Sequence, residues 1–145
     1  GVYSKEWLTP LTETLKQLGS ERAMLVCGSD GLDEITTTGK TYITELNDQK
    51  IFSYELNPED YNIKISSQAD LTGGLPKENA EKIIKLLDGE EGPFRDIAII
   101  NAAAAIYISG EAINIEEGIE LANQSLNSGK AKESLKELIK VSNEE

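Results

Sequence analysis

Two adjacent carboxylates, Asp33 and Glu34, are the side chains of this sequence best suited to chemistry. They lie in a turn-rich loop, residues 28–34, that directly follows a short apolar run at 23–27. Ligands of open α/β sheets bind beyond the carboxyl ends of strands, and neighbouring side chains in an extended loop point to different sides. Mg²⁺ takes hard oxygen ligands, commonly one or two carboxylates with phosphate and water. Asp33 and Glu34 are therefore a candidate magnesium–diphosphate site.

Adjacency alone does not single out this pair. Neighbouring acidic residues occur five times in the chain, at 33–34, 59–60, 90–91, 116–117 and 144–145. Such short patterns arise often without function. The position of the pair at 33–34, at the end of a predicted strand, adds modest weight to the metal-site hypothesis.

Other candidate ligand groups have simpler structural interpretations. Backbone amides at 30–31 and 72–74 could bind phosphate, but neither stretch has P-loop or dinucleotide-binding spacing, and ordinary turns are favoured. Asn101 stands alone on an apolar helix pattern, as either a contact to a neighbouring loop or a ligand group. A buried amide must find partners in either case, so the structural contact is favoured. Cys27 has no cationic neighbour in sequence and is expected to be a small core residue rather than a nucleophile.

The composition excludes several function classes. The 145 residues contain 14 Lys and Arg against 26 Asp and Glu, and the net charge of −12 opposes binding to a nucleic-acid backbone. No histidine is present, which excludes Ser-His-Asp and Cys-His catalysis and histidine-ligated metals. The longest apolar stretch, 97–108, is too short for a transmembrane helix. A single cysteine and no secretory segment at the N-terminus predict a cytoplasmic protein.

The elements around the acidic pair predict an α/β fold with a central sheet. Residues 4–18 have the pattern of an amphipathic helix that ends at Gly19. Four leucines are expected on its buried face: Leu8, Leu11, Leu15 and Leu18. The apolar run 23–27 predicts a strand buried on both faces, which after a helix suggests half of a parallel α/β unit. Segments 41–46 and 51–56 predict a β-hairpin with a four-residue connection.

The second half of the chain is predicted to be helical. Pro76 and Pro93 each open a helix, and the apolar segment 97–108 makes the second of these the central buried helix. A capping box at 114–117 opens the next helix, and Gly129 precedes the last. The apolar positions expected to face inward are Ala80, Ile83, Ile84 and Leu87 in the first of these helices and Leu135, Leu138 and Ile139 in the last.

Short blocks along nearly the whole chain resemble one enzyme family. They are residues 1–4 (Gly-Val-Tyr-Ser), 28–35 (Gly-Ser-Asp-Gly-Leu-Asp-Glu-Ile), 58–60 (Pro-Glu-Asp), 73–74 (Gly-Gly), 78–80 (Glu-Asn-Ala), 101–104 (Asn-Ala-Ala-Ala) and 117–118 (Glu-Gly). The most specific are Asp-Gly-Leu-Asp-Glu and the distant Asn-Ala-Ala-Ala. In this order, from Gly1 to about Leu138, the blocks resemble the C-terminal part of the anthranilate phosphoribosyltransferase family.

The resemblance implies a magnesium enzyme of tryptophan biosynthesis that transfers the phosphoribosyl group of phosphoribosyl diphosphate to anthranilate and releases diphosphate. It implies that Asp33 holds one Mg²⁺ and that Glu34 is shared between two, with weak or no binding in a fragment. Metal neutralisation of the departing diphosphate needs no histidine base, which agrees with the composition. The family often has histidine before the first glycine of this loop. Cys27 stands there instead, which removes any contact of that histidine and leaves the carboxylates unaffected.

The resemblance also implies that much of the enzyme lies before Gly1. The glycine-rich phosphoribosyl-diphosphate loop, the anthranilate-contacting residues and the N-terminal helical domain that forms the homodimer are expected there. Residues 1–145 are thus predicted to be the C-terminal part of one catalytic α/β domain of the phosphoribosyltransferase and nucleoside-phosphorylase type, inactive alone. We expect the first strand to have an unpaired edge through which the fragment self-associates, unless its N-terminal segment rearranges to cover the gap.

Two other functions stay open at this point. A related pyrimidine nucleoside phosphorylase shares the overall fold, but the Asp-Gly-Leu-Asp-Glu block disfavours it. A stand-alone acidic module that binds a partner chain would need no catalytic residues. A Gly-Thr-Gly-Gly-Asp-type loop upstream of Gly1 would favour the transferase, whereas a start codon at that position would favour the module.

Overall fold

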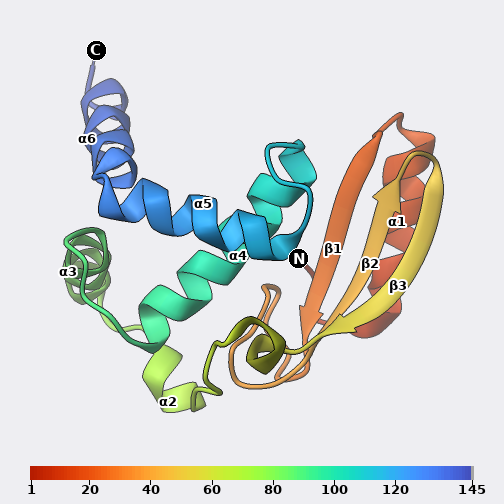
Figure 1. Cartoon of the computed structure of the whole chain (residues 1–145), viewed down its shortest axis with the longest axis horizontal. Helices are drawn as coiled ribbons and strands as arrows, with labels where there is room; N and C mark the ends of the chain where they lie inside the picture. Colours follow the sequence, from red (N-terminus) through yellow and green to blue (C-terminus); the bar gives the residue numbers. More distant parts are fainter. Residues whose placement is uncertain (145) are drawn as a thin grey trace.

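A computed structural model describes residues 1–144 and has a small sheet followed by a set of helices (Figure 1). The sheet lies at one side of the molecule with α1 against it, and the later helices extend away from it. The mixed composition confirms the predicted α/β class. The elements are η1 (Lys5–Trp7), α1 (Leu8–Gln17), β1 (Arg22–Gly28), β2 (Thr41–Asn47), β3 (Lys50–Leu56), η2 (Pro58–Tyr61), α2 (Gln68–Leu71), α3 (Pro76–Leu87), α4 (Pro93–Ser109), α5 (Ile115–Asn127) and α6 (Lys130–Ser142).

The sheet has three antiparallel strands in the order β1-β2-β3. Within the described residues the pairing is not parallel, because β1 pairs with β2 in the antiparallel direction along its whole length; the suggested half of a parallel α/β unit stays a prediction for the other edge of β1. The predicted hairpin is confirmed, but its connection is shorter than expected, since pairing continues to Asn47 opposite Lys50. The two turn residues, Asp48 and Gln49, have φ of 47° and 66°, as a two-residue type I′ turn requires.

β1 is buried on both faces, as predicted. Leu25 and Cys27 pack with Leu8 of α1 on one face. Val26 points the opposite way and packs with Ile100 of α4. Side chains alternate between the faces of a strand, so the continuous apolar sequence of β1 serves two separate contacts.

The outer edge of β1 is partly covered by the first residues of the chain. The Val2 N–H donates to the Val26 carbonyl at 2.9 Å. No strand pairs with the rest of this edge within the described residues. Self-association through it stays a prediction.

The buried face of α1 differs from the expected row of four leucines. Leu8 is buried and Leu15 is half-buried, but Leu11 is exposed and Leu18 is 78% exposed. Thr12 is fully buried beside Leu8, and its hydroxyl is satisfied within the helix by donating to the Leu8 carbonyl at 2.7 Å. The sequence pattern missed this threonine because its side chain is polar.

The central buried helix is α4, as predicted. Ile100 and Ala103 are fully buried in the core next to β1. Helix α5 crosses α4 so closely at Gly118 that a Cβ there would lie 2.5 Å from the Ala103 carbonyl oxygen. Residues 1–144 contain no helix that is both long and apolar enough to cross a membrane.

A buried carboxylate ties α4 to the sheet. Glu45 of β2 is 1% exposed and accepts hydrogen bonds from the hydroxyls of Tyr54 and Tyr107, each at 2.8 Å. Burial and the hydrogen bond to Glu45 raise the pKa of both tyrosines. Both phenols therefore stay protonated donors, and Tyr107 fixes the C-terminal half of α4 over β2.

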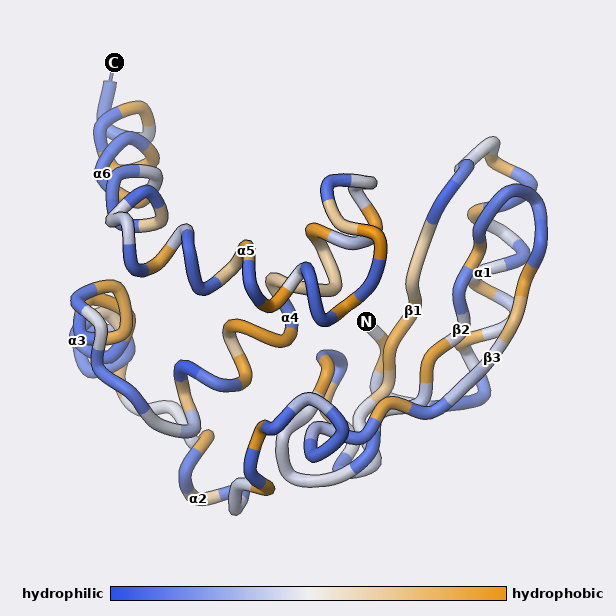
Figure 2. Tube along the Cα trace, viewed as in Figure 1, coloured by the Kyte–Doolittle hydropathy of each residue, from blue (hydrophilic) through white to orange (hydrophobic). Residues whose placement is uncertain are grey.

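The apolar faces of α3 and α6 are largely exposed, contrary to prediction, although Leu87 and Leu135 are half-buried. Hydrophobic positions occur on both helices (Figure 2), yet Ile83 and Ile84 are exposed, as are Leu138 (65%) and Ile139 (54%). Leu86, which was not predicted to be buried, is the buried residue of α3. Amphipathic spacing shows that a face can be buried and does not show what covers it.

Candidate functional site

The acidic pair lies in the loop between β1 and β2. The loop folds back on itself, because the Gly28 N–H donates to the Leu32 carbonyl at 2.8 Å. Its second half, residues 35–37, is buried. The loop is therefore a compact structure with an exposed tip, at the carboxyl end of β1 where the sequence placed it.

Asp30 ties the first half of the loop to the second. One carboxylate oxygen accepts from the Leu32 N–H at 3.1 Å, and the other accepts from the hydroxyls of Thr36 at 2.7 Å and Thr38 at 2.6 Å. Partial burial alone would raise the pKa of Asp30, but the hydrogen bonds to its charged form outweigh this and hold the pKa below its ordinary value. This carboxylate is occupied by the fold.

Asn101 of α4 holds the second half of the loop. Its Oδ1 accepts from the Ile35 N–H at 2.9 Å, and its Nδ2 donates to the carbonyls of Ile35 at 2.8 Å and Ile97 at 2.9 Å. Ile35 directly follows Glu34 in the chain. The favoured interpretation of Asn101, a contact to a neighbouring loop, is confirmed.

Asp33 and Glu34 lie exposed between these two supports. None of the ion pairs formed by residues 1–144 involves either carboxylate. Glu34 lines an open depression of about 540 Å³ that also includes Phe94 of α4. Asp33 does not line it; its carbonyl lies against Gly1, where a Cβ would come within 1.5 Å of the oxygen. The two adjacent residues thus have different surroundings.

The donors suit a hydrated cation rather than a closed protein cage. Within the described part of the chain, no three metal-ligating side chains are grouped so as to hold an ion. Mg²⁺ usually keeps several waters and takes one or two carboxylates together with phosphate oxygens. Asp33 and Glu34 fit Mg²⁺ on this chemistry if the ligand supplies further oxygens, as a diphosphate does.

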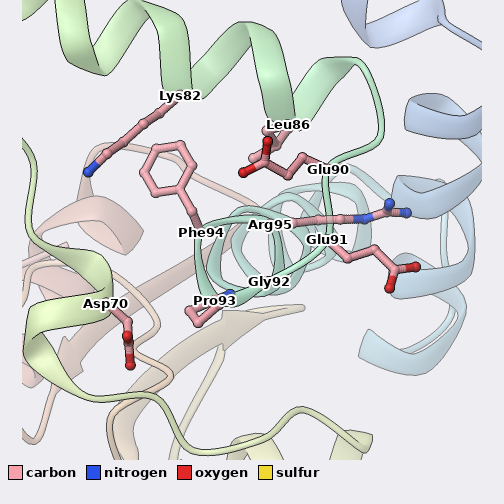
Figure 3. Close-up of a pocket in the computed structure, with 9 residues that line it drawn as sticks. All are labelled: Asp70, Lys82, Leu86, Glu90, Glu91, Gly92, Pro93, Phe94 and Arg95. Carbon is pink, nitrogen blue, oxygen red and sulfur yellow. The ribbon is translucent and has the colours of Figure 1, made fainter.

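A second hollow, of about 230 Å³, lies between α3 and α4 (Figure 3). Phe94 and Lys82 are in its wall, and the charged side chains around it point apart. Arg95 points toward α5, where it donates to the side-chain oxygens of Asn123 at 3.0 Å and Asn127 at 3.3 Å. Because these charges do not converge on a common point, we do not treat this hollow as the functional site.

The remaining sequence candidates have structural roles. The Gly74 N–H donates to Asn79 Oδ1 and the Leu75 N–H donates to Glu78 Oε2, each at 2.7 Å. These amides are used at the start of α3 and are not free to bind phosphate. Cys27 is buried, and burial raises the pKa of its thiol. It is a core residue, as expected.

Sequence reasoning missed the support that Asp30 gives. The sequence assigned this residue to a turn with Gly31 and did not connect it with Thr36 and Thr38. A signal was present, because threonines two positions apart in an extended segment project to the same side. An acidic residue shortly before such a pair can accept from both hydroxyls.

Residues 1–132 match the model of the glycosyl transferase family, a/b domain. The chain belongs to this glycosyl transferase family. The matched range contains the whole acidic loop and all of α4 and ends near the start of α6. The supports of the acidic pair are therefore part of the glycosyl transferase domain.

Similar glycosyl transferase proteins include two anthranilate phosphoribosyltransferases. That of Maricaulis maris is 46% identical over 145 residues, which are all of this chain and 43% of that protein. That of Caldanaerobacter subterraneus is 49% identical over 139 residues, 96% of this chain and 41% of that protein. The family resemblance read from the sequence is thus confirmed. The chain spans about two-fifths of the length of these relatives.

Solved structures agree with this relationship. Anthranilate phosphoribosyltransferase from Thermus thermophilus superimposes with a TM-score of 0.86 at 37% identity, over 94% of this chain and 40% of that chain. The Saccharomyces cerevisiae protein, solved in complex with PRPP and Mg, superimposes with a TM-score of 0.83 at 29% identity over the same shares. The antiparallel sheet and helices described above therefore have the fold of a segment of these transferases.

Proposed function

We propose that this chain is the C-terminal part of the catalytic α/β domain of an anthranilate phosphoribosyltransferase. The whole enzyme transfers the phosphoribosyl group of phosphoribosyl diphosphate to anthranilate, in tryptophan biosynthesis, and releases diphosphate. The observation that carries the proposal is the exposed pair Asp33–Glu34 on a loop supported from both sides, by Asp30 and Asn101. Relatives that bear this name and match the chain over 96% or more of its length support it.

We propose that Asp33 and Glu34 hold Mg²⁺, with Asp33 on one ion and Glu34 shared between two. Bound Mg²⁺ would supply positive charge against the negative charge that develops on the departing diphosphate. The yeast relative, solved in complex with PRPP and Mg, supports a magnesium site in such enzymes, and its division between Asp33 and Glu34 is part of the proposal. The contribution of the chain itself is to present two carboxylates that no described lysine or arginine neutralises.

The proposal assigns leaving-group stabilisation, and not proton transfer, to this segment. Near Glu34, the depression is lined by the hydroxyl of Thr38 and by apolar side chains such as Phe94 and Ile97. None of these is a general acid or base at neutral pH, and Asp30 is occupied by three hydrogen bonds. Electrostatic stabilisation of developing charge is therefore the role that fits these residues.

We propose that residues 1–145 do not suffice for catalysis. The chain spans about two-fifths of its relatives, and the proposal places the phosphate-binding loop, the anthranilate contacts and a dimer-forming helical domain outside it. Misplacement of a substrate by an incomplete site can alone cost about 100-fold in rate. A fragment is expected to bind Mg²⁺ weakly or not at all. We also propose a cytoplasmic location for the whole enzyme.

The deciding experiment follows anthranilate fluorescence with the full-length protein that carries this segment and with residues 1–145 alone. We expect consumption of anthranilate by the full-length protein only, dependent on phosphoribosyl diphosphate and abolished by EDTA. Phosphorolysis of a pyrimidine nucleoside instead would favour the related phosphorylase. Absence of both reactions would favour an acidic partner-binding module, and turnover by residues 1–145 would contradict the predicted inactivity.

A further inference from the structure

We infer that Asn101 is a positioning residue for the metal-binding loop, which acts through Ile35 to fix where Asp33 and Glu34 present their carboxylates. The inference rests on the proposed function, because the position of the carboxylates matters for Mg²⁺ and diphosphate. Asn101 would thus affect the reaction without contacting a ligand, because its side chain bonds the backbone of the loop.

The contact between Asn101 and Ile35 is two-sided. One amide side chain accepts from the N–H and donates to the C=O of the same residue, at 2.9 Å and 2.8 Å. These bonds orient the peptide groups on both sides of Ile35, and the first of those peptide groups belongs to Glu34. The Ile35 side chain is 1% exposed and packs in the same core cluster as Val26 and Ile100. The residue after Glu34 is thus held by its backbone and by its side chain.

Asn101 is itself held in place. Its Nδ2 also donates to the Ile97 carbonyl one turn earlier on α4, which fixes the amide orientation. Near its C-terminal end, helix α4 is fixed by Tyr107, which donates to the buried Glu45 of β2. The loop therefore takes its position from a helix that is tied to the sheet.

Asp30 and Asn101 support the loop through separate sets of hydrogen bonds. Asp30 binds Leu32, Thr36 and Thr38, and none of its contacts involves Asn101. Loss of the Asn101 amide is therefore expected to free the backbone at Ile35 while the hydrogen bonds of Asp30 to Leu32, Thr36 and Thr38 keep the rest of the loop closed. A buried N–H and C=O left without partners would seek water, which would draw this segment outward. The expected effect is local displacement of Glu34 and not unfolding.

The first experiment compares Asn101→Leu with Asn123→Leu in the full-length protein that carries this segment. Leucine has similar size and shape but cannot form hydrogen bonds. Asn123 is a matched control, because its Nδ2 also donates to a carbonyl one turn earlier, Ile119 at 3.0 Å, and its Oδ1 also accepts from another side chain, Arg95. NMR-detected amide exchange should show the Ile35 amide exchanging about tenfold faster in Asn101→Leu. The Gly28 amide, and both amides in the control, should change less than about twofold.

The second experiment measures the Mg²⁺ dependence of turnover in the same two full-length variants. Removing a group that orients a metal ligand typically costs 10- to 100-fold in metal affinity. We expect the Mg²⁺ concentration for half-maximal turnover to rise about tenfold in Asn101→Leu and to stay unchanged in Asn123→Leu. A merely structural role would lower the active fraction, and hence kcat, without moving the Mg²⁺ dependence.

The outcomes separate the inference from the proposed function. If the Ile35 amide of Asn101→Leu exchanges at an unchanged rate, the inference is overturned. It is also overturned if this amide exchanges faster but the Mg²⁺ requirement does not change. Neither result contradicts the proposed function. Absence of Mg²⁺-dependent transfer in the unsubstituted full-length protein overturns the proposed function, and the positioning role falls with it. The unsubstituted protein therefore identifies which of the two has failed.

Discussion

Two acidic pairs in this molecule have the same chemistry and opposite settings. Glu116 and Glu117 lie in the first turn of α5, where the helix dipole favours negative charge, and Glu117 Oε2 accepts from the Ile113 N–H at 2.7 Å. Asp33 and Glu34 lie outside any helix and form no ion pair within the described residues. The pair in α5 contributes to the fold, whereas the pair in the loop is held in place by the fold and remains available.

The difference shows which observation carries functional weight. The pair at 59–60 is also explained by a helical first turn, in η2, and the pair at 144–145 extends beyond the described residues. What distinguishes the exposed loop pair from a pair that caps a helix is the set of hydrogen bonds by which Asp30 and Asn101 hold the loop. Adjacency in sequence is common to all of these pairs and separates none of them.

The largest effect is expected from removing the loop carboxylates in the full-length protein. Glu34→Ala should lower turnover at limiting Mg²⁺ on the order of 100-fold, because it removes a group that helps to stabilise developing charge. Its effect should be at least as large as that of Asp33→Ala. Stability should change by about 0.5 kcal/mol or less, because both side chains are exposed. Glu116→Ala is the matched control and should keep its activity. Full activity of both loop variants at limiting Mg²⁺ would contradict a metal-binding role for Asp33 and Glu34.

A smaller effect is expected where the supporting helix meets α5. Gly118→Ala would place a Cβ 2.5 Å from the Ala103 carbonyl oxygen, so α4 and α5 must move apart. We expect a loss of about 1–2 kcal/mol in the free energy of unfolding, because overpacking outweighs the better helix propensity of alanine. Urea denaturation measures this, with Gln124→Ala on the same helix as control. Equal stability of the two variants would show that α4 and α5 can move apart at little cost in free energy.

The pH dependence of Asp30 sharpens the comparison further. Its pKa is lowered in the folded protein, so its stabilisation is present above the ordinary value of 3.8 and is lost as pH falls through the lowered pKa. Asp30→Asn should cost about 1 kcal/mol near pH 7, allowing for solvent screening of this partly exposed group. The cost should shrink near pH 2. Urea titrations at both pH values provide the measurement, and a pH-independent cost would contradict the charged hydrogen bonds.

The smallest effect is expected at the capping pair. Glu117→Gln keeps an acceptor for the Ile113 N–H and loses only a charge at the start of α5. The loss should be about 0.3–0.5 kcal/mol at low ionic strength and should vanish in high salt. Thermal unfolding at two salt concentrations measures it. A salt-independent loss would mean that the hydrogen bond, and not the charge, explains this pair.

Local patterns predicted much of the fold. Prolines and glycines placed the starts and ends of α3 and α4, and the apolar run placed β1. The same run could not give the direction of pairing, because burial on both faces is compatible with parallel and antiparallel neighbours. The hairpin was predicted with too long a connection, because Asp48 and Gln49 lack the glycine that usually marks a two-residue type I′ turn.

Long-range features could not be predicted in the same way. The sequence identified Asp33 and Glu34 as carboxylates and Asn101 as an amide in need of partners. It could not join them, since the Asn101–Ile35 contact spans 66 positions and leaves no periodic signal between them. The exposed Leu138 and Ile139 show the converse, because an amphipathic pattern was present and no described residue covers it.

The span between Asn101 and Ile35 also has a consequence for the order of folding. The β2–β3 hairpin closes through a two-residue turn, whereas the loop cannot take its final form until α4 has packed against β1. Closing a long stretch of chain costs more entropy than closing a short one, and contacts distant in sequence form slowly. We therefore expect the sheet to mature first and the acidic loop last. A partly folded chain would then carry both carboxylates without yet having a place for a ligand.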